Sequence, residues 1–287
     1  MTTINRRSFL KLAGAGMGGA LLPLGSARAE VDASSHIGML YDTTKCVGCN
    51  ACTNACREWN KTTPERDDEG LYDAPTELTA DTWTLIQLYQ GEGVFSFVKR
   101  QCMHCLEPGC VSGCPVHALQ KTATGAVTYD PSRCIGCRYC MYACPFHVPR
   151  FEWDEVIPLI TKCTLCYDRI TDGKGTACAE ICPTGALIWG KRGDLLAEAE
   201  QRLKENPGKY VNKIYGQYDA GGTSVLYLSH VPFENLGLPT LKTESVPHVS
   251  EEMSNFILPT VLIAGPVLLA AIRLISKRGV WEESWPL

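Results

Sequence analysis

Apolar and polar residues alternate along several short stretches in the middle of the chain, as they do in half-buried β-strands. The longest of these stretches runs from Asp81 to Arg100 and is interrupted by two glycines, which predicts a β-hairpin with a glycine turn. Two shorter strands are expected, one from Val127 to Tyr129 and one from Thr223 to Leu228.

A helical period is clearest from Asp194 to Asn206, where leucine and alanine recur every three or four residues before a Pro-Gly pair. Together with the predicted strands, this helix indicates an α+β fold built from short elements.

The first 29 residues contain the three zones of an export signal. A positive region with Arg6 and Arg7 precedes a stretch rich in Gly, Ala and Leu, and Ala27-Arg28-Ala29 then forms a small-x-small cleavage pattern. The arginine pair followed by Phe-Leu-Lys resembles the twin-arginine signal, which exports folded proteins. We therefore expect residues 1–29 to be a twin-arginine signal peptide, and the alternative is the basic start of a cytosolic helix.

A second apolar segment, from Phe256 to Ile272, contains no charged residue and is close to the short limit for crossing a bilayer. Acidic residues precede it and basic residues follow it, so the positive-inside rule places the C-terminus in the cytoplasm. We expect a transmembrane helix at 254–276, a cytoplasmic tail at 277–287, and a body on the periplasmic face of the inner membrane. A buried core helix is the alternative.

Composition changes this picture in one respect, because the 287 residues include sixteen cysteines. A count this high indicates either disulfides or bound metal. The cysteines form four groups, and none lies outside them. In chain order the groups are Cys46, Cys49, Cys52 and Cys56; Cys102, Cys105, Cys110 and Cys114; Cys134, Cys137, Cys140 and Cys144; and Cys163, Cys166, Cys178 and Cys182.

The spacing within the groups favours iron–sulfur clusters. The third group matches C-x₂-C-x₂-C-x₃-C-P, the run found in bacterial two-cluster ferredoxins. There, three cysteines surround three corners of one cubane, and the fourth reaches a neighbouring cluster. The first group has the same spacing without the proline, and the other two lengthen one gap but stay complete. Sixteen ligands therefore predict four [4Fe–4S] clusters.

Other uses of cysteine explain the pattern less well. Disulfides suit an exported protein, but they do not explain four repeated C-x₂-C pairs. Structural zinc uses C-x₂-C pairs but does not call for C-x₃-C-P. Covalent haem needs a histidine directly after C-x₂-C, and the residues there are Asn50, Leu106, Arg138 and Tyr167. A zinc or disulfide binding module is the alternative of another class.

Exchange of the fourth ligand between paired groups predicts which cysteines share a cluster. The second and third groups are as close in sequence as in a two-cluster ferredoxin, so we expect them to pair, which leaves the first and fourth groups to pair. The predicted ligands are Cys46, Cys49, Cys52 and Cys182 for cluster 1; Cys56, Cys163, Cys166 and Cys178 for cluster 2; Cys102, Cys105, Cys110 and Cys144 for cluster 3; and Cys114, Cys134, Cys137 and Cys140 for cluster 4.

This pairing predicts tandem ferredoxin-like dicluster halves with an inserted hairpin, within a domain at 30–250. The inner half would lie at about 93–150, and the outer half would combine 37–66 with 151–190.

Little in the sequence indicates catalysis or nucleic-acid binding. The net charge is −4, and there is no long basic run. No Ser-His-Asp order, nucleotide-binding glycine loop or carboxylate pair stands out, so no catalytic residue is predicted. His104, His117 and His147 lie within the cysteine groups, where they either donate hydrogen bonds to cluster sulfur or are simply packed or solvated.

With these groups in place, the chain resembles the four-cluster subunits of membrane-bound respiratory oxidoreductases. It is similar to the iron–sulfur subunit of hydrogenase-2-type nickel–iron hydrogenases at Gly38 to Asp42, Gln101 to Cys105, Cys137 to Met141 and Val231 to Leu236. Members of that family carry their own twin-arginine signal and a single C-terminal membrane helix.

The beta subunits of formate dehydrogenases are similar as well, at Glu58 to Asn60, Tyr72 to Thr84 and Lys162 to Cys166. Those subunits also end in one membrane helix, but they usually travel on the signal of their catalytic partner. The separate export signal of this chain favours the hydrogenase resemblance.

The resemblance implies an electron-transfer subunit that does no substrate chemistry of its own. Its partners would be a periplasmic catalytic subunit and an integral membrane subunit linked to quinone. The catalytic subunit would be a nickel–iron hydrogenase or, as the alternative, a formate dehydrogenase or related molybdopterin oxidoreductase. The electron donor, the direction of flow and the quinone stay open.

Overall fold

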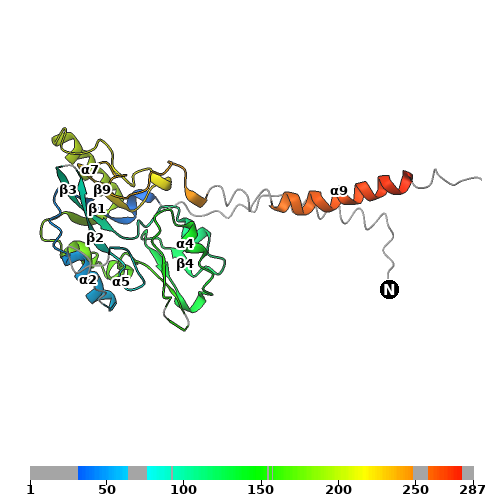
Figure 1. Ribbon diagram of the computed structural model, residues 1–287, viewed down its shortest axis with the longest axis horizontal. Helices are drawn as coiled ribbons and strands as arrows, with labels where there is room; N and C mark the ends of the chain where they lie inside the picture. Colours follow the sequence, from blue (N-terminus) through cyan, green and yellow to red (C-terminus); the bar gives the residue numbers. More distant parts are fainter. Residues whose placement is uncertain are drawn as a thin grey trace, which may run out of the picture. The chain divides into compact units, whose positions relative to one another are not determined.

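The computed structural model of the protein describes residues 32–63, 76–91, 93–153, 155–156, 158–247 and 258–279. The expected signal peptide at 1–29 lies outside the described residues, as does the predicted tail from residue 280 onward. Within the described residues, the body combines short helices with small sheets (Figure 1), so the prediction of a mixed fold is confirmed.

A three-stranded sheet organises the body. Its central strand is β1 (Ile37–Asp42), which pairs antiparallel with β8 (Leu187–Lys191) and parallel with β9 (Val225–Leu228). The strand predicted at 223–228 is β9. Segments from the two ends of the body therefore meet in one sheet.

One face of this sheet is covered by helix α7 (Arg192–Glu205). Leu40 of β1 and Leu226 of β9 share a buried cluster with Leu195 and Ala199 of the helix. The apolar positions of α7 recur at helical spacing for this reason, and the helix predicted at 194–206 is confirmed.

The predicted hairpin is also confirmed. It consists of β2 (Leu85–Gly91) and β3 (Val94–Arg100), which pair along their whole lengths. Gly93 has a φ of +73° in the turn, a conformation that glycine adopts without strain.

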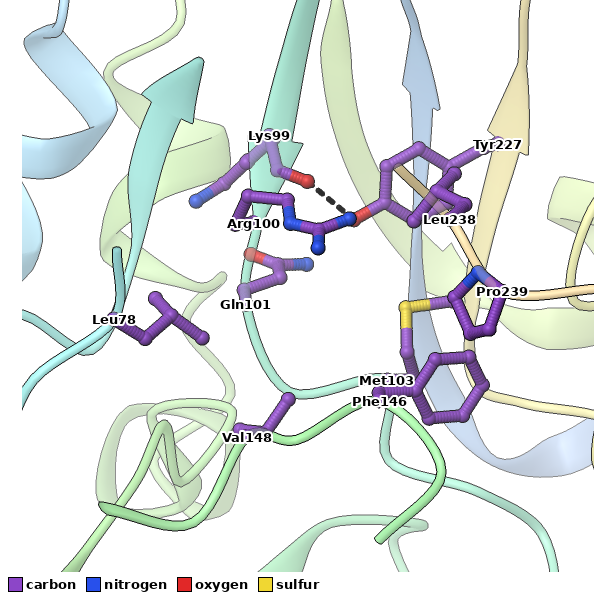
Figure 2. A pocket seen from close by; sticks show the side chains of 10 residues that line it. All are labelled: Leu78, Lys99, Arg100, Gln101, Met103, Phe146, Val148, Tyr227, Leu238 and Pro239. Atoms are coloured by element: carbon purple, nitrogen blue, oxygen red, sulfur yellow. Dashed lines mark hydrogen bonds between the residues drawn. The ribbon is translucent and has the colours of Figure 1, made fainter. Parts of the chain in front are cut away.

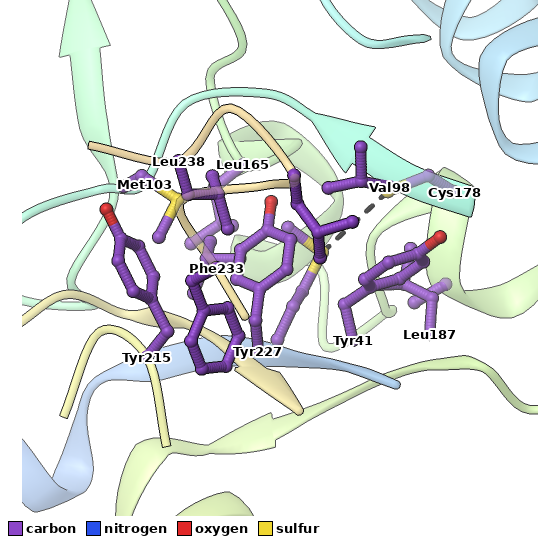
Figure 3. Close-up of a cluster of buried hydrophobic side chains, with 14 of the residues drawn as sticks. Tyr41, Val98, Met103, Leu165, Cys178, Leu187, Tyr215, Tyr227, Phe233 and Leu238 are labelled. Atoms are coloured by element: carbon purple, nitrogen blue, oxygen red, sulfur yellow. Dashed lines mark hydrogen bonds between the residues drawn. The ribbon is translucent and has the colours of Figure 1, made fainter. Parts of the chain in front are cut away.

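The hairpin lies on the other face of the sheet, where tyrosines attach it. Tyr41 Oη donates to the carbonyl oxygen of Phe97 at 3.0 Å. Tyr227 Oη donates to the carbonyl oxygen of Lys99 at 2.8 Å (Figure 2). Both rings share a buried cluster with Val98 (Figure 3). This face of the sheet therefore holds strand β3 in a fixed position.

The remaining elements are short. The strands are β4 (Leu119–Lys121), β5 (Val127–Tyr129), β6 (Arg150–Phe151) and β7 (Ile160–Thr161). The helices are α2 (Ala51–Asn60), α3 (Gly109–Ser112), α4 (Tyr139–Ala143), α5 (Tyr167–Thr171) and α6 (Ala177–Glu180). Three 3₁₀ turns are η1 (Ala33–Ser35), η2 (Pro131–Arg133) and η3 (Asp219–Gly221). The strand predicted at 127–129 is β5, and helix α2 packs against α6 while α3 packs against α4.

A final helix, α9 (Leu258–Gly279), overlaps the transmembrane span expected at 254–276. Across the ranges that the structure describes, no helix combines the length and the apolar character needed to cross a membrane. The expected transmembrane span is therefore not confirmed.

Candidate functional site

Each cysteine group follows the same path, from a loop into a short helix. The third cysteine of each group lies on a helix: Cys52 on α2, Cys110 on α3, Cys140 on α4 and Cys178 on α6. Cys56 lies on α2 about one turn beyond Cys52, as the spacing predicts. Helices therefore set the position of the third cysteine in every group and, in the first group, of the fourth as well.

A left-handed residue occurs at the same place in every group, two positions after the first cysteine. These residues are Gly48, His104, Gly136 and Leu165, with φ between 47° and 69°. In three of them, Gly48, Gly136 and Leu165, the backbone N–H donates to the sulfur of the first cysteine at 3.4–3.5 Å. A β-carbon on Gly48 would lie 2.4 Å from the Phe97 ring, so this position requires glycine.

A second repeated turn follows the Cys-Pro pairs. The third residue after Cys114, Cys144 or Cys182 donates its N–H to that cysteine's carbonyl oxygen at 3.1–3.4 Å. The donors are His117, His147 and Gly185, all with positive φ. The N–H of Ala118 then donates to Cys114 Sγ at 3.2 Å. Burial raises the pKa of the Cys182 thiol, but such hydrogen bonds outweigh burial and lower it below its usual value.

Two cavities are lined by cysteines of the first and fourth groups. One cavity is lined by the cysteines that we call set 1, which are Cys46, Cys49, Cys52 and Cys182. The other cavity is lined by set 2, which is Cys56, Cys163, Cys166 and Cys178. Each set takes three cysteines from one group and one from the other, so the structure brings together the residues predicted for clusters 1 and 2.

The cysteines of the second and third groups also form two sets, each with three cysteines from one group and one from the other. Burial raises the pKa of Cys140 to about 12, and three nearby thiols raise it further. These thiols are Cys114, Cys134 and Cys137, and we call the four residues Cys114, Cys134, Cys137 and Cys140 set 4. Burial also raises the pKa of Cys105 well above its usual value, and again three thiols add to the effect. They complete set 3, which is Cys102, Cys105, Cys110 and Cys144. The structure places these thiols near one another, and their role as ligands stays a prediction.

The four sets are connected in numerical order. Electrostatic interactions between thiols link each set to the next, through Cys52 with Cys178, Cys163 with Cys102, and Cys110 with Cys140. All sixteen cysteines lie in the described residues, and among them Cys49 of set 1 and Cys137 of set 4 are the exposed ones. The two ends of this series therefore reach the surface.

None of these sixteen described cysteines forms a disulfide. In the same described segments, no three or more His, Cys, Asp or Glu side chains converge closely enough to hold one metal ion. A cubane separates its thiolates more widely than a single ion does, because each thiolate binds a different iron.

Comparison with known proteins supports the same chemistry. Residues 94–192 match the family model described as a 4Fe-4S dicluster domain. The hydrogenase-2 operon protein HybA of Escherichia coli O157:H7 is 38% identical over 93% of this chain and 94% of its own length. The chain belongs to this 4Fe–4S dicluster family.

Two further relatives extend the match. A protein of Nitratidesulfovibrio vulgaris is 42% identical over 96% of this chain and 78% of its own length. The iron–sulfur subunit of the nitrate-inducible formate dehydrogenase of Escherichia coli is 37% identical over 69% of this chain and 70% of its own length. The resemblance to both kinds of subunit is confirmed, and this dicluster protein is an iron–sulfur electron-transfer subunit.

Two buried lysines near the cysteines, Lys99 and Lys162, carry positive charge that could balance the negative charge of iron–sulfur clusters. Lys99 is fully buried and donates to Thr84 Oγ1. Lys162 is buried and donates to the carbonyl oxygens of Val127 and Cys163. The ion pairs of the described residues include neither lysine. A buried ammonium needs a counter-charge, and a thiolate-ligated cubane carries net negative charge, so these residues fit such a cluster.

The cysteines themselves act on Lys99. Burial would lower the pKa of its ammonium, but Cys52, Cys178 and Cys56 outweigh burial and raise it. Lys99 therefore lies within electrostatic reach of sets 1 and 2 together.

Buried polar atoms near the cysteines that lack a hydrogen-bond partner among the described residues include one ring nitrogen of His104 and both amide atoms of Gln101. His104 Nδ1 accepts from the N–H of Val127 at 2.9 Å, which leaves its Nε2 unpaired. Gln101 is 4% exposed, and neither its amide nitrogen nor its amide oxygen is paired. By contrast, His117 and His147 are exposed.

The sequence singled out His104 but not Gln101. The signal that could have found it is positional, since Gln101 lies two residues after the buried Lys99 and directly follows the last residue of strand β3. Alternate residues of a strand share a face, so two polar residues at this spacing indicate a polar group on the inner side.

Proposed function

We propose that the chain carries electrons singly through four [4Fe–4S] clusters held by sets 1 to 4. The observation that carries this proposal is the exposure of Cys49 and Cys137 at the ends of the series, while every cysteine of set 2 is buried. A series whose exposed cysteines lie in its two terminal sets suits transfer between two partner proteins. The clusters, when bound, supply one-electron redox chemistry.

In this proposal the residues of the chain hold and tune the clusters. The cysteines supply four thiolates to each site, and N–H groups such as those of Gly48, Gly136 and Leu165 stabilise the negative sulfur. Lys99 and Lys162 compensate the charge in the interior. No residue of the chain acts on a substrate.

We infer that the catalytic partner, at one end of the series of sets, is a nickel–iron hydrogenase. The partner at the other end would be an integral membrane subunit linked to quinone. Support comes from the extent of the match to the hydrogenase-2 operon protein, which covers 93% of this chain and 94% of that relative. A formate dehydrogenase or related molybdopterin oxidoreductase is the second candidate, because its iron–sulfur subunits are 37% identical over 69–76% of this chain.

We further infer that the protein works at the periplasmic face of the inner membrane after twin-arginine export. Residues 254–276 would attach it beside the membrane subunit, and the tail at 277–287 would be cytoplasmic. Support comes from the uncharged run between Phe256 and Ile272 and from the exposed apolar side chains of Leu262, Leu268 and Leu269 on α9. Export predicts that an Arg6→Lys, Arg7→Lys variant accumulates in the cytoplasm.

Iron and acid-labile sulfide analysis of the purified chain tests the cofactor. We expect about sixteen of each per chain, and a content well below this would overturn the four-cluster proposal. The native complex, extracted from membranes with mild detergent, tests the partner. Hydrogen should reduce its clusters, seen by electron paramagnetic resonance, and reduction by formate but not hydrogen would replace the first candidate by the second.

Attachment to the membrane has its own test. Washing membranes with alkaline carbonate should leave the native chain in the pellet, and a chain ending at residue 250 should be released. Release of both chains by the wash would contradict attachment through residues 254–276.

A further inference from the structure

Gln101 is a buried amide with no hydrogen-bond partner among the described residues. Only 4% of the residue is exposed, and both Nε2 and Oε1 are unpaired. Leaving a buried polar group unpaired costs about 1–3 kcal/mol, so such a side chain in a folded protein indicates a partner outside the polypeptide.

The position of this amide points to that partner. Gln101 lines the cavity that is also lined by the four cysteines of set 2. It also lines a neighbouring cavity with Lys99, Arg100 and Met103, where Figure 2 shows its amide group. In the chain it directly precedes Cys102, the first cysteine of set 3. The amide therefore lies where the outer and inner halves of the series meet.

The same cavity already contains one hydrogen bond from an amide to sulfur. Asn60 lines it, and its Nδ2 donates to Cys56 Sγ at 3.4 Å and to the carbonyl oxygen of Cys56 at 2.8 Å. Asn60 thus has its partners within the chain, whereas Gln101, which lines the same cavity, has an amide donor with no partner among the described residues.

We propose that the side-chain amide of Gln101 donates a hydrogen bond to a sulfur of the cluster held by Cys56, Cys163, Cys166 and Cys178. This inference rests on the proposed function. A hydrogen bond to cluster sulfur stabilises the reduced form, which carries one more negative charge, and so raises the reduction potential. Gln101 is therefore a positioning and tuning residue at the step between set 2 and set 3, where Cys163 and Cys102 interact.

Gln101→Met tests the proposal, because methionine has a similar length and no donor. In a redox titration followed by electron paramagnetic resonance, we expect one cluster to shift to a more negative potential. That cluster should be the one lost in Cys56→Ala. The matched control is Gln120→Met, because the Gln120 amide is exposed and donates to the carbonyl oxygen of His117 at 3.2 Å. It should leave every potential unchanged.

A second measurement needs no variant that could fail to fold. The native complex, labelled with ¹⁵N in the glutamine side chain, should show a nitrogen coupling to one reduced cluster in electron spin echo spectra. Absence of that coupling, or unchanged potentials in Gln101→Met with full iron content, would overturn the proposal and indicate water as the partner. Iron far below four clusters in the native chain would instead refute the proposed function.

Discussion

Tyr227 and Lys99 are joined by a hydrogen bond of 2.8 Å, from the phenol of the first to the main-chain carbonyl oxygen of the second (Figure 2). Tyr41 makes the equivalent bond to Phe97 at 3.0 Å. Tyrosines from two neighbouring strands, β1 and β9, thus donate hydrogen bonds to alternate carbonyl groups of β3. This attachment fixes the strand that carries the buried ammonium of Lys99 and leads into Gln101.

Tyr227→Phe should lower the thermal midpoint of unfolding of the cluster-loaded protein. The substitution removes one buried hydrogen bond and leaves the Lys99 carbonyl without that donor, which costs about 1–3 kcal/mol. Differential scanning calorimetry measures the change. Tyr142→Phe, at a side chain that is 88% exposed, is the control and should match the parent. Equal midpoints for both variants would show that the bond contributes nothing.

Lys99→Met should make the reduction potentials of two clusters more negative. The buried ammonium interacts with Cys52 of set 1 and with Cys56 and Cys178 of set 2, and a positive charge stabilises the more negative reduced state. A redox titration followed by electron paramagnetic resonance detects the shift. Lys204→Met, at an exposed position on α7, should leave all potentials as they are. A shift of equal size in both variants would contradict a local effect.

Paired substitutions test the exchange of ligands between groups. Cys56→Ala and Cys163→Ala should each remove about four iron atoms per chain, and the double variant should lose no more than either one. Cys52→Ala combined with Cys56→Ala should lose about eight, although the two residues are one helical turn apart on α2. Iron analysis gives the answer directly. A loss of only about four in this second pair would mean that both cysteines serve one cluster.

Protonation of His36 should lower the free energy of unfolding of the protein in mild acid. Burial lowers the pKa of its imidazole, Lys121 and Arg192 lower it further, and Asp32 acts in the opposite direction. The unfolded chain therefore binds more protons, so the free energy of unfolding falls as the pH drops through 6.5 and stops falling below the folded pKa. Thermal midpoints from about pH 7.5 to about pH 5.5 should fall less in His36→Gln than in the parent. An identical fall in both would exclude His36 as the source.

Local signals in the sequence were sufficient for the secondary structure near the cysteines. The alternation between Asp81 and Arg100 predicted the hairpin because one side of it packs on the sheet, and the helical period after Asp194 predicted α7 because its apolar side packs on Leu40 and Leu226. Cysteine spacing predicted the chemistry, since a cubane needs ligands at corners that a short loop can reach.

Long-range relationships could not be predicted in the same way. Nothing in the residues of β1 indicates that it pairs with β8 on one side and in parallel with β9 on the other. The burial of Lys99 and Gln101 also depends on which segments cover the end of β3, and that arrangement is set by tertiary packing. For α9, the uncharged run predicted a helix, whereas the membrane span stays unconfirmed.

The pairing of β1 with β8 and β9 also has a consequence for the order of events during synthesis. Strand β1 ends at Asp42, before the first cysteine, and β8 begins at Leu187, after the last one. A ribosome must therefore release all sixteen cysteines before the central strand can acquire either of its neighbours. A nascent chain halted before residue 187 would contain every thiol but no completed three-stranded sheet, so iron delivery can precede closure of the fold.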